Sequence, residues 1–84
     1  MGMVRHNVVE DVLGIGIYCG DYSHCDIRRN IVRGTRANPR SSDRMTHGHA
    51  ILSHFYAQAT VDANVLEGNA NDMRAAASGR IRYR

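Results

Sequence analysis

Three segments of the chain share one short pattern, and this repetition constrains the fold more than any other feature. Each segment has an apolar residue, two variable positions, an asparagine and then two apolar residues, the first of them β-branched. The segments are residues 4–9, 27–32 and 61–66, and a turn residue follows each of them: Asp11, Gly34 and Gly68. Self-similarity at a period of about 20 to 50 residues indicates a solenoid or a related array.

The spacing of the three segments locates an insertion. Their asparagines, Asn7, Asn30 and Asn64, are 23 and 34 residues apart. Residues 14–30 align with residues 48–64 without a gap, which places Gly14 opposite Gly48. The 11 additional residues therefore lie between positions 34 and 48. We interpret one unit as about 23 residues and residues 35–47 as a loop insertion in the second unit.

These units predict an all-β chain, a right-handed parallel β-helix of about three coils. We expect one domain over residues 1–84, with units at about 4–26, 27–60 and 61–84, and strands at 15–19, 26–29 and 31–33. A single coil cannot bury its apolar side, whereas coils stacked about 4.8 Å apart pair their strands and form a continuous core. Asn7, Asn30 and Asn64 are predicted to be left-handed and to form an inward ladder of amide hydrogen bonds.

The end of the chain is expected to be less regular. Residues 71–74 look like a degraded strand, residues 75–77 are interpreted as a helical turn, and residues 81–84 as a further strand. Open ends of the stack predict either missing coils of a longer β-helix or self-association. The alternative is a small α+β domain in which the repetition is accidental, and circular dichroism dominated by helix would support it.

Composition excludes several classes of partner. The net charge is +3, from 11 arginines and no lysine against 8 acidic residues. This is not the clustered basic stripe of a nucleic-acid-binding protein, so no nucleic-acid partner is predicted. No apolar run approaches the roughly 18 residues of a membrane span, and the first residues carry no signal-peptide pattern. We therefore predict no membrane partner, and the sequence leaves the location of the protein open.

Two cysteines flank one predicted turn. Cys19 and Cys25 align with Ser53 and Ala59, which favours small packed side chains. A disulfide across the turn is the alternative. The aligned pair Tyr22 and Tyr56 is expected to stack outside the core, either as cross-strand packing or as a sugar-binding platform.

The motifs resemble a known family. Gly-Ile-Gly-Ile-Tyr at residues 14–18, a polar turn, Ile-x-x-Asn-Ile-Val at residues 27–32 and then Gly34 are similar to the parallel β-helix repeat of pectate-lyase-like proteins. The similarity runs from Val4 to about Gly68 and is specific for fold, because lyases, hydrolases, uronate epimerases and tailspikes share this repeat. It implies a substrate groove along residues 14–18 and 48–52, and a secreted, periplasmic or cell-surface location. The clustered aspartates with which pectate lyases hold Ca²⁺ are missing, so no cofactor is predicted, with Ca²⁺ as the alternative.

The insertion supplies the candidate functional residues, because arginines suit the carboxylates of a polyuronate. The catalytic candidates, for a reaction of the polysaccharide lyase or uronate epimerase type, are Arg40, Arg44 and His47. The substrate-binding candidates are Arg36, Arg40, Asp43, Arg44, His49 and Tyr18. No metal site is predicted, because His47, His49 and His54 belong to a loop, an inward position and a turn.

Two functions follow from this reading. The first is a module that binds or modifies an acidic polysaccharide through the arginine-rich loop beside the groove strand. The second is a non-catalytic structural or adhesive segment of a longer β-helix, in which the loop is an exposed polar connection. Arginine side chains directed toward residues 48–52 would favour the first function, and arginines directed into solvent would favour the second.

Overall fold

The computed structural model describes residues 2–40 and 47–83. Within these residues the chain forms ten strands and no helix, so the prediction of an all-β chain is confirmed. No described helix is long and apolar enough to cross a membrane. The strands are β1 (Gly2–Arg5), β2 (Val8–Glu10), β3 (Ile15–Cys19), β4 (His24–Arg28), β5 (Ile31–Arg33), β6 (His49–His54), β7 (Gln58–Asp62), β8 (Val65–Glu67), β9 (Asn71–Ala76) and β10 (Arg80–Tyr83).

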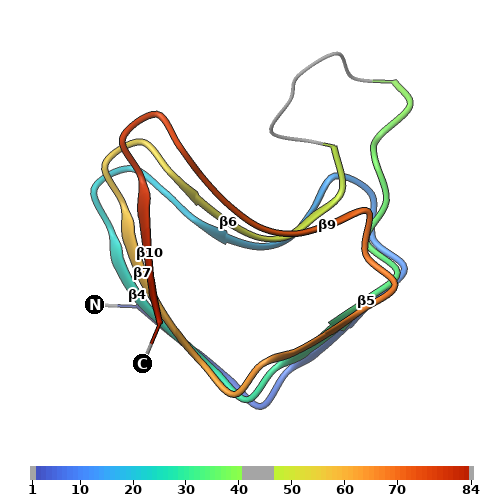
Figure 1. Ribbon diagram of the computed structural model, residues 1–84, viewed down its shortest axis with the longest axis horizontal. Coiled ribbons are helices and arrows are strands. Elements are labelled where there is room, and N and C mark those ends of the chain that lie inside the picture. The colour runs from blue at the N-terminus through green and yellow to red at the C-terminus, as the bar shows by residue number, and fades with distance from the viewer. Residues whose placement is uncertain (1, 41–46, 84) are drawn as a thin grey trace.

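The strands form three parallel sheets, in the orders β1-β4-β7-β10, β2-β5-β8 and β3-β6-β9. Consecutive strands belong to different sheets, so each circuit of the chain visits every sheet once (Figure 1). Equivalent strands of successive circuits lie on top of one another along the shortest dimension of the molecule, 16 Å of 31 × 26 × 16 Å. Each strand is therefore held mainly by residues one full circuit away.

The strand register pairs the residues that the sequence alignment places together. Ile17 lies opposite Ile51, and Ile31 lies opposite Val65. The chain between β5 and β6 leaves the stack at one corner, where the insertion was predicted (Figure 1). The predicted helical turn at residues 75–77 is wrong, because Ala75 and Ala76 belong to β9 and pair with β6.

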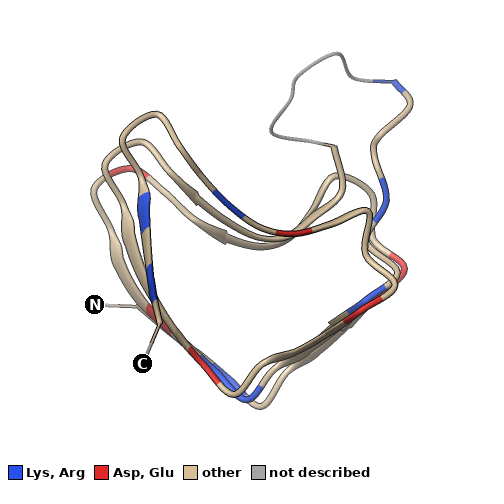
Figure 2. Ribbon diagram, viewed as in Figure 1, with Lys and Arg blue, Asp and Glu red and all other residues tan. Residues whose placement is uncertain are grey.

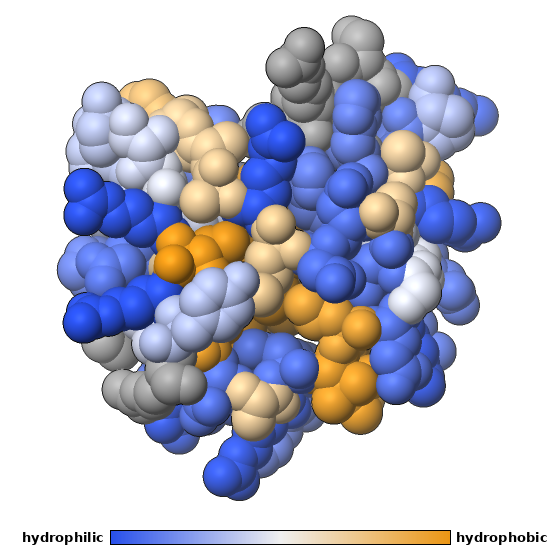
Figure 3. All heavy atoms as spheres, viewed as in Figure 1, coloured by the Kyte–Doolittle hydropathy of each residue, from blue (hydrophilic) through white to orange (hydrophobic). Residues whose placement is uncertain are grey.

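Apolar side chains that point inward form columns along the stack, one member from each circuit. The buried core consists of Ile17, Cys19, Ile27, Val32, Ala50, Ile51, Ala57, Ala59 and Val61. It holds no aromatic residue. Leu66 on β8, Met73 on β9 and Ile81 on β10 are partly buried and pack against this core. Figure 3 shows hydrophobic side chains exposed on the face seen along the stack. Burial of each large aliphatic side chain stabilises the fold by about 1.5–3 kcal/mol.

The predicted asparagine ladder is confirmed, with one correction. The side-chain oxygen of Asn30 accepts hydrogen bonds from the backbone nitrogen of Asn7 at 3.0 Å and from its amide nitrogen at 3.2 Å. The oxygen of Asn64 accepts the equivalent two bonds from Asn30, both at 3.0 Å. The expected left-handed backbone is found one position earlier, at His6, Arg29 and Ala63, with φ between 51° and 54°. The bend thus precedes the ladder residue and aims its side chain inward.

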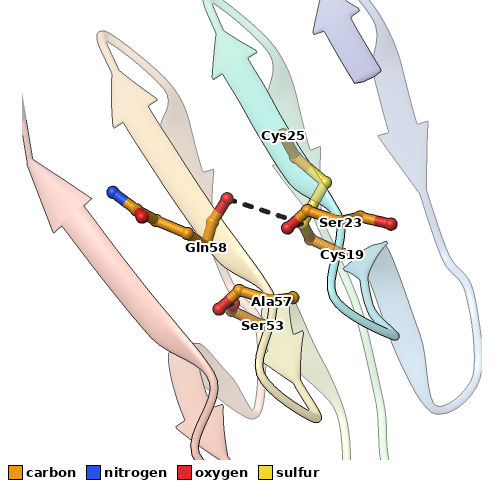
Figure 4. Close-up of a disulfide and its surroundings, with 6 residues drawn as sticks. All are labelled: Cys19, Ser23, Cys25, Ser53, Ala57 and Gln58. Atoms are coloured by element: carbon orange, nitrogen blue, oxygen red, sulfur yellow. Dashed lines mark hydrogen bonds between the residues drawn. A yellow bond between two sulfur atoms is a disulfide. The ribbon is translucent and has the colours of Figure 1, made fainter. Parts of the chain in front are cut away.

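The first turn between the β3 and β1 sheets is closed by a disulfide between Cys19 and Cys25, with their Cα atoms 6.1 Å apart (Figure 4). The interpretation of the two cysteines as merely small packed residues is therefore wrong. In the next circuit Ser53 occupies the position of Cys19, and its hydroxyl donates to the carbonyl oxygen of Ala57 at 3.2 Å. The same turn is closed covalently in one circuit and by a hydrogen bond in the other.

Replacement of Gly16 by alanine is expected to destabilise the fold by about 1–3 kcal/mol through overpacking. A Cβ atom at this position would lie 2.7 Å from the carbonyl oxygen of Ala50 and 2.8 Å from Cγ1 of Val32. Gly2→Ala is the matched control, because a Cβ there meets nothing within 4 Å. Urea midpoints measure the difference, and equal midpoints for the two variants would contradict the packing seen at Gly16.

Candidate functional site

The outer face of the β3-β6-β9 sheet carries two of the exposed groups that suit a glycan. Tyr18, Leu52 and Arg74 occupy one register position on successive strands. Side chains alternate between the two sides of a strand, so this position faces away from the inward Ile17, Ile51 and Met73. Leu52 is buried, whereas Tyr18 is 49% exposed and Arg74 is exposed. An aromatic ring and a guanidinium therefore flank a covered leucine.

Tyr18 contacts a histidine at the end of β6. The Tyr18 hydroxyl lies 3.5 Å from Nδ1 of His54, and the ring centroids are 6.3 Å apart. His54 is half-buried and follows Leu52 by two residues, so it belongs to the same outer face. This pair can offer a hydroxyl and an imidazole nitrogen to the hydroxyl groups of a ligand. Our reading of the sequence gave His54 no role, although its spacing from Leu52 places it there.

The basic side chains described in the loop before β6 are exposed to solvent. An antiparallel bridge between Ala37 and His47 closes the loop at its base. Arg36, Arg40 and His47 are exposed. Two further predicted site residues, Asp43 and Arg44, lie outside the described residues. Both ends of the loop are fixed on Gly14, whose nitrogen donates to the carbonyl oxygen of Arg36 at 2.6 Å and whose oxygen accepts from Gly48 at 2.9 Å.

Of the predicted binding residues, His49 lies away from this surface. It is 3% exposed, and it occupies the register position of Ile15 in the preceding circuit. The alignment of His49 with Ile15 already indicates an inward position. Because His49 is buried, a polymer on the outer face cannot contact it. Among the described residues, no three His, Cys, Asp or Glu side chains gather as metal ligands do.

Two arginines form ion pairs with neighbouring carboxylates on the other two sheets. Arg28 contacts Asp26 at 2.6 Å, and Arg33 contacts Glu10 at 2.7 Å. The hydrogen bond that Arg33 donates to the Glu10 carboxylate raises the pKa of Arg33 above its usual value. Arg36, Arg40 and Arg74 make no ion pair with another residue in the described part of the chain.

Figure 2 shows basic positions both on this loop and on β9, where an acidic position also occurs. Unpaired positive charge therefore occurs at the β3-β6-β9 sheet, and Arg5, Arg29, Arg80 and Arg82 on the β1-β4-β7-β10 side likewise make no ion pair with a described residue.

Aromatic residues gather beyond the end of this sheet, in the turns that lead to β4 and β7. The turn cluster consists of Tyr22, Phe55 and Tyr56, all exposed. The rings of Tyr22 and Tyr56 are stacked with centroids 5.2 Å apart and planes 5° apart, as the sequence alignment predicts. Phe55 meets both edge-on. With Tyr18, the cluster accounts for four of the five Phe and Tyr residues of the chain.

The chain matches no protein-family model, no curated protein and no solved structure. The site is thus interpreted from its own geometry. That geometry joins exposed aromatic rings, a histidine and unpaired guanidinium groups along one side of the stack.

Proposed function

We propose that the chain is a short right-handed parallel β-helix of the pectate-lyase-like type, and that it binds an acidic polysaccharide across the outer face of the β3-β6-β9 sheet. The β-helix is supported by the chain's repeated return to the same three parallel sheets. Connections between parallel strands of one sheet are right-handed in about 98% of cases, which supports the right-handed form. The proposal is limited to binding. Lyase or epimerase activity remains an expectation from the resemblance.

One observation carries the proposed function: Tyr18 and the unpaired Arg74 share a register position on the sheet that the Arg36 and Arg40 loop adjoins. A polyuronate has a carboxylate on each sugar and an apolar ring face. Guanidinium groups bind carboxylates through two parallel hydrogen bonds, and aromatic rings pack against the apolar faces. The arrangement thus offers both kinds of contact to one extended polymer.

The disulfide agrees with this proposal. Disulfides persist in secreted, periplasmic and cell-surface proteins and are rare in a reducing cytosol. The Cys19–Cys25 bond therefore suits a protein that meets polysaccharides outside the cytosol.

A structural or adhesive segment is the second candidate, and the exposure of Arg36 and Arg40 favours it. Val8, Leu13 and Val65 belong to the outermost circuits and are 58%, 53% and 45% exposed. Unpaired strand edges with apolar side chains pair readily with further strands, from additional coils or from another copy. In this function the outer face of the β3-β6-β9 sheet has no ligand.

The charge-specific test compares two triple variants with the same loss of charge. Wild-type protein is expected to bind a short oligogalacturonate more tightly than a neutral cello-oligosaccharide, with an affinity that falls as salt is raised. The site variant is R36S/R40S/R74S, and the control variant is R5S/R29S/R82S. Isothermal titration is expected to show about a tenfold or greater loss for the site variant and less than about a twofold loss for the control.

Equal losses in both triple variants would mean that only the overall charge matters. A wild-type protein that shows no preference for the acidic probe would exclude acidic-polysaccharide binding. A wild-type protein that binds neither probe would leave the structural segment as the function.

A further inference from the structure

The turns that follow β3, β6 and β9 have the same backbone shape and stack in register. Tyr22, Tyr56 and Ser78 occupy the same place in the three turns, with φ values of 65°, 61° and 65°. The backbone nitrogen of Tyr22 donates to the carbonyl oxygen of Phe55 at 3.0 Å, and the nitrogen of Tyr56 donates to Ala77 at 3.2 Å. The third turn is therefore placed on the second as the second is placed on the first.

The side chains interrupt this regularity at the third turn. Tyr22 covers one face of the Tyr56 ring at a centroid distance of 5.2 Å. On the other side the next turn has Ser78, and no described ring is stacked there. Tyr56 is 54% exposed. With a serine in place of a third tyrosine, the second face of Tyr56 has no described ring stacked on it.

Folding alone gives little reason for aromatic residues at these positions. Tyr22, Phe55 and Tyr56 have φ values of 65°, 53° and 61°, in the left-handed region that glycine and asparagine adopt most readily. The stack imposes this backbone at its corners, since His6, Arg29 and Ala63 share it, so the turn itself requires no aromatic side chain. The rings do not fill the core, because they lie outside it.

The surroundings of Tyr56 supply polar partners. Gln58 follows Tyr56 by two residues on β7, and Arg80 lies opposite Gln58 on β10. Ser78 and Arg80 are exposed, and Gln58 is half-buried. A hydroxyl, an amide and a guanidinium therefore lie on turn and strand residues next to Tyr56. Such groups beside an aromatic face are the combination that holds a sugar ring by its apolar face and its hydroxyl groups.

We propose that the face of Tyr56 turned toward Ser78 is a subsite in which one hexopyranose ring continues the tyrosine stack. A chain of ring contacts connects this subsite to the outer sheet face: Tyr18 with His54 at 6.3 Å, His54 with Phe55 at 6.4 Å, and Phe55 with Tyr56 at 5.3 Å. The subsite deepens the proposed function. It rests on the binding of glycans but not on the preference for acidic ones.

The decisive test is a substitution that fills the subsite with a side chain of the protein itself. Ser78→Tyr completes the tyrosine stack and is expected to weaken binding of both oligogalacturonate and cello-oligosaccharide by roughly 3- to 10-fold, without lowering the thermal midpoint. Tyr56→Ser removes the binding face and is expected to cause the same loss. Tyr83→Ser is the matched control, because it removes an exposed tyrosine that lies outside the turn cluster, and its affinities should stay within about twofold of wild type.

The outcomes separate this subsite from the proposed function. Wild-type affinity of Ser78→Tyr for both probes would overturn the subsite, even if the acidic probe is preferred. Equal affinity of wild type for the two probes, with both affinities reduced in Ser78→Tyr, would support the subsite and overturn the acidic preference. No binding of either probe by wild type would overturn both. Should Tyr56→Ser fail to fold, the comparison of Ser78→Tyr with Tyr83→Ser still decides.

Discussion

Replacement of Asn30 by alanine is expected to destabilise the protein by about 3–5 kcal/mol, a large part of the stability of a chain this small. Asn30 is fully buried. Besides the bonds it accepts from Asn7, its amide nitrogen donates to the carbonyl oxygen of Val4 at 2.9 Å and to the side-chain oxygen of Asn64 at 3.0 Å. Alanine leaves these buried groups without partners and opens a cavity between two circuits.

The matched control is Asn7→Ala, at the exposed end of the same ladder. Asn7 is exposed, and its amide nitrogen donates to the carbonyl oxygen of Arg5 at 3.0 Å. Its loss leaves fewer buried groups unsatisfied, so a cost of about 1 kcal/mol is expected. Urea unfolding followed by circular dichroism measures both variants. If Asn30→Ala costs no more than Asn7→Ala, the ladder does not hold the circuits together.

Reduction of the Cys19–Cys25 disulfide is expected to destabilise the protein by about 2 kcal/mol. The bond closes a short loop, with a sequence separation of 6, and restricts the unfolded chain around that loop. The sulfur of Cys19 also packs 3.8 Å from the carbonyl oxygen of Gln58 in the next circuit, so the bond touches the stacking contact as well (Figure 4). Thermal midpoints with and without reductant measure the effect.

The double variant C19S/C25S is the control for this measurement. Its midpoint should equal that of the reduced wild-type protein and should not respond to reductant. The hydroxyl of Ser53 closes the equivalent turn without a disulfide, so the variant is expected to fold. A wild-type midpoint that is unchanged by reductant would show that the bond is absent or contributes nothing.

The register of the sheets could be predicted because side-chain columns follow directly from aligned residues. The placement of Ile17 opposite Ile51, and the hydrogen bonds of the asparagine ladder, need only the pattern of apolar and asparagine positions. The left-handed residues were misplaced by one position, since Arg29 and Ala63 carry no preference for that conformation. Geometry imposed by the stack overrides local propensity there.

Other features depend on contacts that the pattern does not contain. The disulfide requires the two cysteine side chains to converge across a turn, and spacing alone does not fix their directions. A further asparagine bridge, in which Asn69 accepts from the nitrogen of Thr35 at 2.9 Å and donates to Val32 at 2.9 Å, was missed. Its signal was present, because Asn69 follows Gly68 as Thr35 follows Gly34.

The candidate site was predicted only in part. Tyr18 could be assigned from its place on β3, and the exposed Arg36 and Arg40 could be assigned from their place in the loop. Arg74 was missed, because residues 71–74 lack the apolar alternation of the equivalent strands even though they pair as β9. Ionic side chains on the outer face do not disturb pairing, which depends on the inward positions and the backbone.

Gly14 has a consequence for how a chain of this kind diversifies. One residue of the lower circuit fixes both the departure and the return of the connection before β6, through Arg36 and Gly48. The strands on either side therefore keep their places whatever the length and composition of the segment between them. The entropy cost of closing a loop grows only slowly with its length. At this corner one loop can therefore be exchanged for another while the strands keep their pairing.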